Sequence, residues 1–255
     1  RLALRGMVAG LDGREVFLGA IPFFHVYGMT TCLLFAESIG AEVAMVPRPR
    51  PVDTVMQVIQ KRKVTVFPGV PTLYSAINDH PKIKDFDLRS VRLCVSGAAS
   101  LPGEVQATFE RLTGGKLTEG YGLTEASPVT HINPLYGKRK AGSIGVPVPG
   151  VDARIVDLET REPLPPGREG ELAVRGPQVM KGYWGRPEET AQTIVDGWLL
   201  TGDVARMDEE GFFFIVDRKK DMIAASGFKI LPREVEEVLL MHPKVKEAVV
   251  AGVPD

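Results

Sequence analysis

Short apolar runs alternate with helical periodicities in the first half of the chain. Runs that fit β-strands begin near Ala41, Val64, Val91 and Lys116, and a spacing of roughly 25 residues leaves room for a crossover helix each time. Strands joined by crossover helices lie parallel in one sheet. We therefore expect an α/β fold whose sheet is mostly parallel.

Two of the intervening segments have the period of an amphipathic helix. In the first, apolar residues recur at i, i+3, i+4 and i+7 from Val52, with Asp53 in the first turn and basic residues 61–63 at the end, the charge order that the helix dipole favours. The second is expected to begin at Pro102 and to end at the glycines 114–115, because glycine readily adopts the conformation that closes a helix.

The pattern changes from about Gly142, where Pro and Gly separate short β-like runs. These runs are Val151–Val156, Glu171–Val174, Trp198–Leu200 and Phe212–Val216. Short strands bounded by turn residues predict an antiparallel, barrel-like subdomain.

The last part of the chain reads as the beginning of a small α+β domain. A helix is expected to start at Pro232, and 247–250 reads as a further strand. The pattern thus predicts an α/β part at 1–141, a β-rich part at 142–219 and the start of a separate small domain at 220–255.

Composition narrows the classes of protein to which the chain can belong. With 44% apolar and 25% charged residues, it has the make-up of a soluble globular protein. A net charge of −1 gives no reason to expect a nucleic-acid partner. Cys32 and Cys94 lie among apolar residues without metal-like spacing, so we expect buried, reduced thiols, as in a cytosolic protein. No run approaches the ~18 apolar residues of a membrane span.

The segment Tyr121-Gly122-Leu123-Thr124-Glu125 is the first candidate for chemistry. It follows a predicted strand, so we expect it in a loop beyond a carboxyl end, where ligands bind in open α/β sheets. Its aromatic ring, glycine, hydroxyl and carboxylate could stack on a base, contact a phosphate and hold Mg²⁺. A tight turn with a surface acid is an equally weighted alternative.

Three other segments carry weaker signals. The small residues of Ser96-Gly97-Ala98-Ala99-Ser100 would let a planar group lie against the backbone, although a strand-to-helix connection capped by Ser100 is the more common reading. Asp203 is either a loop aspartate that holds a ribose diol or an ordinary β-turn acid. Arg218, beside two lysines, reads by default as part of a solvated charged turn.

The histidines give no catalytic pattern. His25 stands in an aromatic run, where a histidine is more often packed and hydrogen-bonded than catalytic, and His131 has no evident partner. The sequence shows no cluster that indicates zinc and no nucleophile–His–acid arrangement.

In this order and spacing, the segments resemble the motifs of the adenylate-forming superfamily, which includes acyl-CoA synthetases, aryl-CoA ligases, luciferases and peptide-synthetase adenylation domains. The matching segments are Pro22-Phe23-Phe24-His25-Val26-Tyr27-Gly28, Ser96-Gly97-Ala98-Ala99, Tyr121-Gly122-Leu123-Thr124-Glu125, 170–177 with 180–184, 197–203, and Asp217-Arg218-Lys219-Lys220-Asp221. The resemblance covers nearly the whole chain.

The resemblance implies a role for each matching residue. The nucleotide-binding residues would be Gly97, Ala98, Ala99, Tyr121 and Gly122 at the adenine and acyl-adenylate, Thr124 at the α-phosphate, and Asp203 and Arg218 at the ribose hydroxyls. Glu125 would hold Mg²⁺, Lys220 would be the hinge between the large domain and the lid, and His25 would be a gate near the acyl and thiol entrance.

The implied reaction has two steps and uses ATP and CoA. A carboxylate attacks the α-phosphate of ATP to give acyl-AMP and pyrophosphate, and the thiol of CoA then displaces AMP. Such chemistry needs positioning and charge neutralisation more than a protein nucleophile. The family's phosphate loop and its lid lysine would lie before Arg1 and beyond Asp255, so both ends are read as cut and this polypeptide alone is not expected to catalyse the reaction.

The implied substrate is a fatty acid. His25 takes the place of the aspartate that amino-acid-activating relatives usually carry, and the segments 217–223 and 226–228 are most similar to those of bacterial medium- and long-chain fatty acyl-CoA synthetases, as is His131-Ile132-Asn133-Pro134. An aryl acid is the second reading, and a non-catalytic nucleotide-binding fragment is the rival from another class. The expected location is cytoplasmic, and a peripheral contact with the inner face of the membrane stays open.

Overall fold

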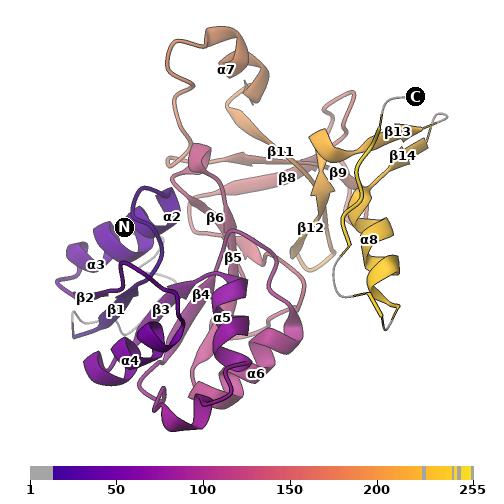
Figure 1. Cartoon of the computed structure of the whole chain (residues 1–255). Helices are drawn as coiled ribbons and strands as arrows, with labels where there is room; N and C mark the ends of the chain where they lie inside the picture. The colour runs from indigo at the N-terminus through magenta and orange to yellow at the C-terminus, as the bar shows by residue number, and fades with distance from the viewer. Residues whose placement is uncertain (1–13, 226–227, 243, 246–247, 254–255) are drawn as a thin grey trace. The chain divides into compact units, whose positions relative to one another are not determined.

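The computed structural model in Figure 1 describes residues 14–225, 228–242, 244–245 and 248–253. The chain divides into two compact units, which we call unit 1 and unit 2. Unit 1 consists of Arg1–Val151 and Gly176–Lys181, and unit 2 of Asp152–Arg175 and Gly182–Asp255. The predicted domain boundaries after residues 141 and 219 stay predictions.

Unit 1 contains a seven-stranded sheet with the spatial order β2-β1-β3-β4-β5-β6-β7. Its strands are β1 (Val16–Gly19), β2 (Glu42–Met45), β3 (Val66–Gly69), β4 (Leu93–Ser96), β5 (Lys116–Gly122), β6 (Val129–Ile132) and β7 (Val146–Pro147). The first five pair in parallel, and β6 and β7 are antiparallel additions at one edge. The predicted, mostly parallel α/β sheet is confirmed, although β1 was not predicted.

Helices lie on both faces of this sheet. They are α2 (Val26–Gly28), the π-helical η1 (Met29–Leu34), α3 (Phe35–Ser38), α4 (Asp53–Arg62), α5 (Pro71–Asn78), α6 (Gly103–Thr113) and the 3-10 turns η2 (Ile83–Asp85) and η3 (Thr124–Ala126). One core contains Leu18 and Phe67 together with side chains of α4, α5 and α6. Their sequence neighbours Phe17 and Val66 face the opposite way and pack with Phe35 of α3. This alternation is the two-residue period of a sheet that is covered on both faces.

The two predicted helices of unit 1 are confirmed as α4 and α6. Lys63 closes α4 with φ 51°, and Gly114 closes α6 with φ 74°. The N-cap of α6 is Pro102, so the suggestion that Ser100 caps this helix was wrong. Cys32 and Cys94 are both buried, free thiols, as predicted, and burial raises the pKa of Cys32 to about 11.

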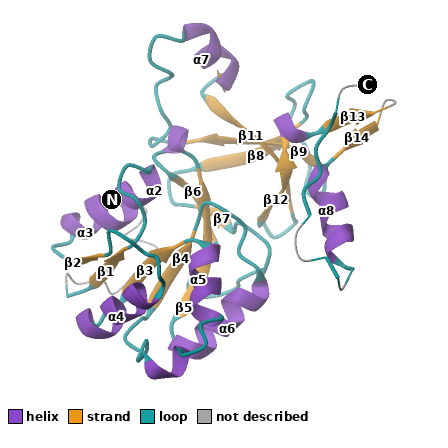
Figure 2. Ribbon diagram, in the orientation of Figure 1, coloured by secondary structure: helices purple, strands orange, loops and turns teal. Residues whose placement is uncertain are grey.

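Unit 2 is built on an antiparallel sheet with the order β10-β11-β9-β8, to which β12 adds beside β11 (Figure 2). Its elements are β8 (Asp152–Val156), β9 (Glu169–Arg175), α7 (Pro187–Thr193), β10 (Ile194–Val195), β11 (Trp198–Met207), β12 (Phe213–Arg218), η4 (Lys219–Asp221), β13 (Ile223–Ala225), β14 (Phe228–Ile230) and α8 (Pro232–Leu240). Register shifts interrupt β11 in its pairing with both neighbours. The predicted antiparallel, barrel-like character of this part is confirmed.

Two predictions for this half of the chain need correction. β11 was expected to end at Leu200, but it continues to Met207 past an irregularity. Residues 248–250 form no strand, and Glu247 lies outside the described residues. The helix expected from Pro232 is α8. Among the residues that the structure describes, no helix is both long and apolar enough to cross a bilayer.

Candidate functional site

The first group of predicted residues lies where β4 of unit 1 ends. β4 stops at Ser96, and Gly97, Ala98 and Ala99 follow as a loop at the carboxyl end of the parallel sheet. Ala98 has φ 70°, and a non-glycine residue in this region costs about 1–3 kcal/mol unless its surroundings enforce it. A strained loop at this edge of an α/β sheet is typical of a ligand contact.

Gly97 lets an aromatic ring lie close against the backbone. A Cβ atom at position 97 would lie 3.2 Å from Cε1 of Tyr27. The Tyr27 hydroxyl donates to the carbonyl oxygen of Val95 at 2.6 Å, and the hydroxyl of Tyr74 lies 3.1 Å from the same oxygen. Burial raises the pKa of both phenols well above 10, so both remain neutral donors. The hydroxyl of Tyr74 also donates to the carbonyl oxygen of Phe67 at 2.7 Å, so Tyr27 fixes the end of β4 and Tyr74 links β4 to β3.

His25 connects to the same group through Tyr27. It is the N-cap of α2, and its Nδ1 accepts from the backbone N–H of Tyr27 at 3.1 Å. The side chain is exposed, so it is hydrogen-bonded, as expected of an ordinary histidine, but it is not packed. The structure thus brings the predicted gate His25 and the predicted wall residue Gly97 to the two ends of one tyrosine.

Tyr121 and Gly122 belong to β5, so the expectation that the whole 121–125 segment is a loop was wrong. Tyr121 pairs across the sheet with His131 on β6, with ring centroids 6.0 Å apart at 63°. His131 is buried, its Nδ1 lies 3.0 Å from the hydroxyl of Thr130, and burial lowers its pKa to about 3. The neutral histidine is therefore a partner of the Tyr121 ring, which the sequence did not reveal.

A tight loop from Gly122 to Pro128 presents the phosphate and metal candidates. A Cβ atom on Gly122 would lie 1.8 Å from the carbonyl oxygen of Pro128, so only glycine fits at the start of the loop. Thr124 is exposed and Glu125 is half-buried in η3. The backbone N–H of Met180 donates to the carbonyl oxygen of Glu125 at 2.7 Å. The loop is closed by backbone contacts, and these orient the two side chains.

The donor set is compatible with Mg²⁺. Within the described part of the chain, no group of three or more His, Cys, Asp or Glu side chains could hold a metal by itself. Magnesium is commonly held by one or two carboxylates together with substrate phosphates and water. Glu125, a single half-buried carboxylate beside the Thr124 hydroxyl, fits that mode of binding.

The predicted ribose residues lie together in unit 2. Asp203 on β11 pairs directly with Arg218 on β12, and Arg218 Nε lies 3.2 Å from Asp203 Oδ1. Asp203 is 6% exposed. It was expected in a loop, but it lies inside β11 at the irregularity between Leu200 and Val204, next to Gly202 with φ 74°. Strand irregularities of this kind re-aim side chains beside functional sites.

Sequence reasoning missed the residue that supports this pair. Glu171 on β9 is 4% exposed, and it accepts from the backbone N–H of Gly202 at 2.9 Å and from Nζ of Lys219 at 2.8 Å. A carboxylate directly before the apolar run Leu172-Ala173-Val174 was the available signal, because charged residues are rarely buried without a partner. Lys220 follows as an exposed residue of η4 and, with Asp217, lines a cavity of about 760 Å³.

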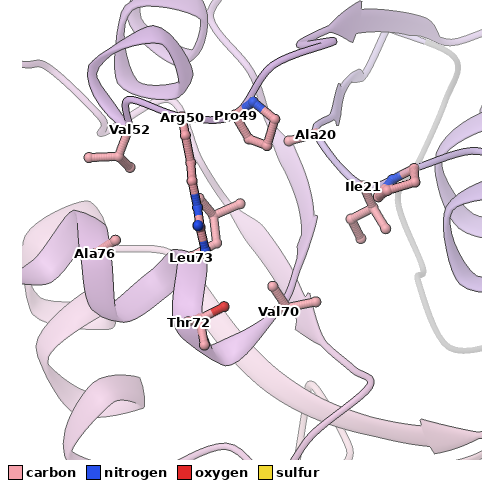
Figure 3. A pocket seen from close by; sticks show the side chains of 10 residues that line it. Ala20, Ile21, Pro49, Arg50, Val52, Val70, Thr72, Leu73 and Ala76 are labelled. Carbon is pink, nitrogen blue, oxygen red and sulfur yellow. The ribbon is translucent and has the colours of Figure 1, made fainter.

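Unit 1 also contains a cavity of about 230 Å³ at the carboxyl ends of β1 and β3. Its walls are mostly apolar, and Figure 3 shows Arg50 extending along Leu73 toward Thr72. The volume is below the ~300–1,000 Å³ that is usual for a small-molecule pocket. We therefore assign no ligand to this cavity.

Comparison with known proteins gives these residues a family context. The family model described as AMP-binding enzyme matches residues 3–184. A long-chain-fatty-acid–CoA ligase of Bacillus subtilis is 54% identical over 244 residues, which are 96% of this chain and 43% of that protein. The ligase of the same name from Escherichia coli O157:H7 is 44% identical over 243 residues, 95% of this chain and 43% of that protein. The chain thus spans a little under half the length of the curated relatives that it matches.

Solved structures agree with the sequence comparison. MatB from Rhodopseudomonas palustris with bound ATP has a TM-score of 0.89 and 33% identity, covering 99% of this chain and 50% of that one. An anthranilate CoA ligase in complex with anthranoyl-AMP has a TM-score of 0.87 and 31% identity, covering 100% of this chain and 49% of that one. The motifs, the fold and these similarities lead to one conclusion: the chain belongs to the family of AMP-binding enzymes, within the adenylate-forming superfamily.

Proposed function

We propose that the full-length protein is an AMP-forming fatty acid–CoA ligase. The observation that carries the proposal is the 54% identity over 96% of the chain to a protein named long-chain-fatty-acid–CoA ligase. The protein would activate a fatty acid with ATP to acyl-AMP and pyrophosphate, and would then transfer the acyl group to CoA. We propose a cytoplasmic location.

The residues of unit 1 take the adenylate in this proposal. Gly97, Ala98 and Ala99 form a backbone wall at the end of β4, and Tyr121 supplies an aromatic face at the end of β5. Thr124 donates to an α-phosphate oxygen. The chemistry depends on placing the carboxylate in line with this phosphorus, because good alignment of reactants removes several kcal/mol from a barrier.

Mg²⁺ would be held by Glu125, whose half-buried carboxylate fits a site shared with phosphate oxygens and water. When bound, the ion supplies neutralisation of the phosphate charge. Gly122 and the contact from Met180 hold the loop that carries this carboxylate.

In this proposal, residues of unit 2 bind the ribose and allow the lid to turn between the two half-reactions. Asp203 and Arg218 bind the ribose hydroxyls, and Arg218 also pairs with the Asp203 carboxylate. Lys220 acts as the hinge of the lid. His25 gates the acyl and thiol entrance from its position at the start of α2.

An aryl-CoA ligase is the second candidate. A tobacco 4-coumarate–CoA ligase is 38% identical over 251 residues, which are 96% of this chain and 46% of that protein. This identity is lower than that of the fatty acid ligases, so we favour a fatty acid.

The test is AMP release by the full-length protein with CoA and a panel of acids that includes medium- and long-chain fatty acids, 4-coumarate and anthranilate. We expect the highest kcat/KM with a fatty acid and no turnover by the 255-residue chain alone. A preference for an aryl acid would favour the second candidate. A full-length protein that binds AMP but activates no acid would overturn both.

A further inference from the structure

The strand pair of unit 2 that carries the ribose candidates is held by an unusual residue of β9. Glu171 is 4% exposed, and its neighbours Leu172 and Ala173 are fully buried. A carboxylate in such a position is stable only if it is paired and hydrogen-bonded. The partners of Glu171 therefore show what the residue does in this structure.

Each carboxylate oxygen of Glu171 has a partner on a different segment. Oε1 accepts from the backbone N–H of Gly202 in β11 at 2.9 Å, and Oε2 accepts from Nζ of Lys219, the residue after β12, at 2.8 Å. Gly202 precedes Asp203, and Lys219 follows Arg218. One buried carboxylate is thus tied to the sequence neighbour of both ribose candidates.

The contact to β11 replaces part of the sheet ladder. β11 pairs with β9 at Leu200 and again at Val204, with a register shift between them. Between these two positions, the Glu171 side chain accepts from the backbone N–H of Gly202, which has no partner in the β9–β11 register. The hydroxyl of Thr201 donates to the carbonyl oxygen of Leu172 at 2.8 Å. The Glu171 carboxylate therefore fixes the backbone just before Asp203.

We propose that Glu171, together with Lys219, is a positioning pair that sets the Asp203–Arg218 unit for a vicinal diol. The inference rests on the proposed function, in which Asp203 and Arg218 bind the ribose hydroxyls. Glu171 touches no substrate. It holds the two strand ends at the separation at which the Asp203 carboxylate is aligned with both hydroxyls.

A purely structural ion pair is the competing explanation. The side chain of Lys219 is 38% exposed, but the Glu171 carboxylate is buried, so the pair could simply satisfy a buried charge. A structural role would weaken every ligand alike, whereas a positioning role acts through the hydroxyls of the diol. The two explanations thus differ in how the variants respond when the hydroxyls are removed from the ligand.

The experiment measures dissociation constants of AMP and 2′,3′-dideoxy-AMP by calorimetry on the full-length protein. We expect Glu171→Gln and Lys219→Met to weaken AMP binding about fivefold, the scale of one imperfect hydrogen bond, and to change dideoxy-AMP binding less than about twofold. Glu169→Gln removes an exposed carboxylate of the same strand and should change neither constant. Lys219→Arg should restore most of the AMP affinity.

Asp203→Asn separates this inference from the proposed function. If Asp203→Asn leaves the affinities for both ligands unchanged, the ribose assignment itself fails. If Asp203→Asn weakens AMP alone while Glu171→Gln and Lys219→Met weaken neither ligand, only the positioning inference fails. Equal weakening of AMP and dideoxy-AMP by Lys219→Met would overturn it in favour of a structural role, and this variant decides the matter even if Glu171→Gln folds poorly.

Discussion

The end of β4 in unit 1 and the irregular part of β11 in unit 2 both carry residues proposed to bind the nucleotide, yet different forces hold them in place. The end of β4 is fixed by the hydroxyl of Tyr27 and linked to β3 by that of Tyr74, and both side chains are buried and neutral. The β11 segment is fixed by ion pairs in which Asp203 and Glu171 are buried while the cationic side chains are 61% and 38% exposed.

This difference bears on how each region can behave during a reaction cycle. A neutral hydrogen bond between buried groups responds little to salt and has few alternative partners. A half-exposed cation stays partly hydrated when it separates from its carboxylate, although the buried carboxylate then needs another partner. We infer that the β4 wall keeps one geometry, whereas the ribose strands, which lead directly into Lys220, can readjust.

The largest expected effect concerns Glu125 of unit 1, the proposed ligand of Mg²⁺. Glu125→Ala in the full-length protein should slow adenylation by ~10²–10³, about 3–4 kcal/mol, because a fixed electrostatic stabiliser is lost. Pyrophosphate release from acid plus ATP measures this step. Glu104→Ala, which removes an exposed carboxylate of the same unit, is the control, and a Glu125→Ala rate within threefold of the wild type would contradict the assignment.

The next effect tests whether His131, the buried partner of the Tyr121 ring in unit 1, is neutral. Burial lowers its folded pKa to about 3 from about 6.5 in an unfolded chain. The unfolded state therefore binds the proton more readily, and stability is lost as the pH falls below about 6.5. Between pH 7 and pH 5, wild type should lose about 2 kcal/mol more of its free energy of unfolding than His131→Asn does.

Urea titrations of the two proteins at both pH values measure this difference, because the contributions of other groups cancel. The exposed His242 provides the control, since His242→Asn should behave like wild type. A His131→Asn variant with the same pH dependence as the wild type would show that the buried ring accepts a proton within the fold.

Much of the fold follows from local pattern. The helices α4 and α6 and the parallel strands β2 to β5 were predicted, because periodicity and crossover spacing are properties of the sequence itself. The strand β1 was missed, since its place between β2 and β3 depends on pairing across the chain. Asp203 was put in a loop because Thr-Gly-Asp has the composition of a turn, and a strand irregularity has the same composition.

The supporting residues of the site could be predicted least well. Tyr27 reaches Val95 across 68 residues, and Glu171 reaches Gly202 and Lys219 across 31 and 48 residues. No local pattern encodes such contacts. The candidate functional residues were named from motifs, but the contacts by which the fold holds them became visible only in three dimensions.

A smaller effect is expected at Lys220, the proposed hinge. Proline fixes φ near −65° and removes the N–H, and it restricts the residue before it, so Lys220→Pro should favour one lid orientation. We expect adenylation to survive and consumption of preformed acyl-AMP by CoA to fall at least about tenfold, or about 1.4 kcal/mol. The two half-reactions are assayed separately, and an equal loss in both would show that Lys220 is not the hinge.

The smallest effect addresses the comparison most directly. Tyr27→Phe removes a hydrogen bond of 2.6 Å while the Tyr74 hydroxyl remains near the same oxygen, so the free energy of unfolding should fall by about 1 kcal/mol. Lys219→Met should cost at least about 1 kcal/mol, because it leaves the buried Glu171 carboxylate without its cation. Raising NaCl from about 0.1 M to 1 M shortens the screening length from about 10 to 3 Å. The Tyr27→Phe loss should not change, whereas the Lys219→Met loss should shrink.

Tyr136→Phe, which removes an exposed hydroxyl, serves as the control for Tyr27→Phe. If both losses respond to salt in the same way, the two regions are not held by different forces. The inference that only β11 and β12 readjust would then be wrong.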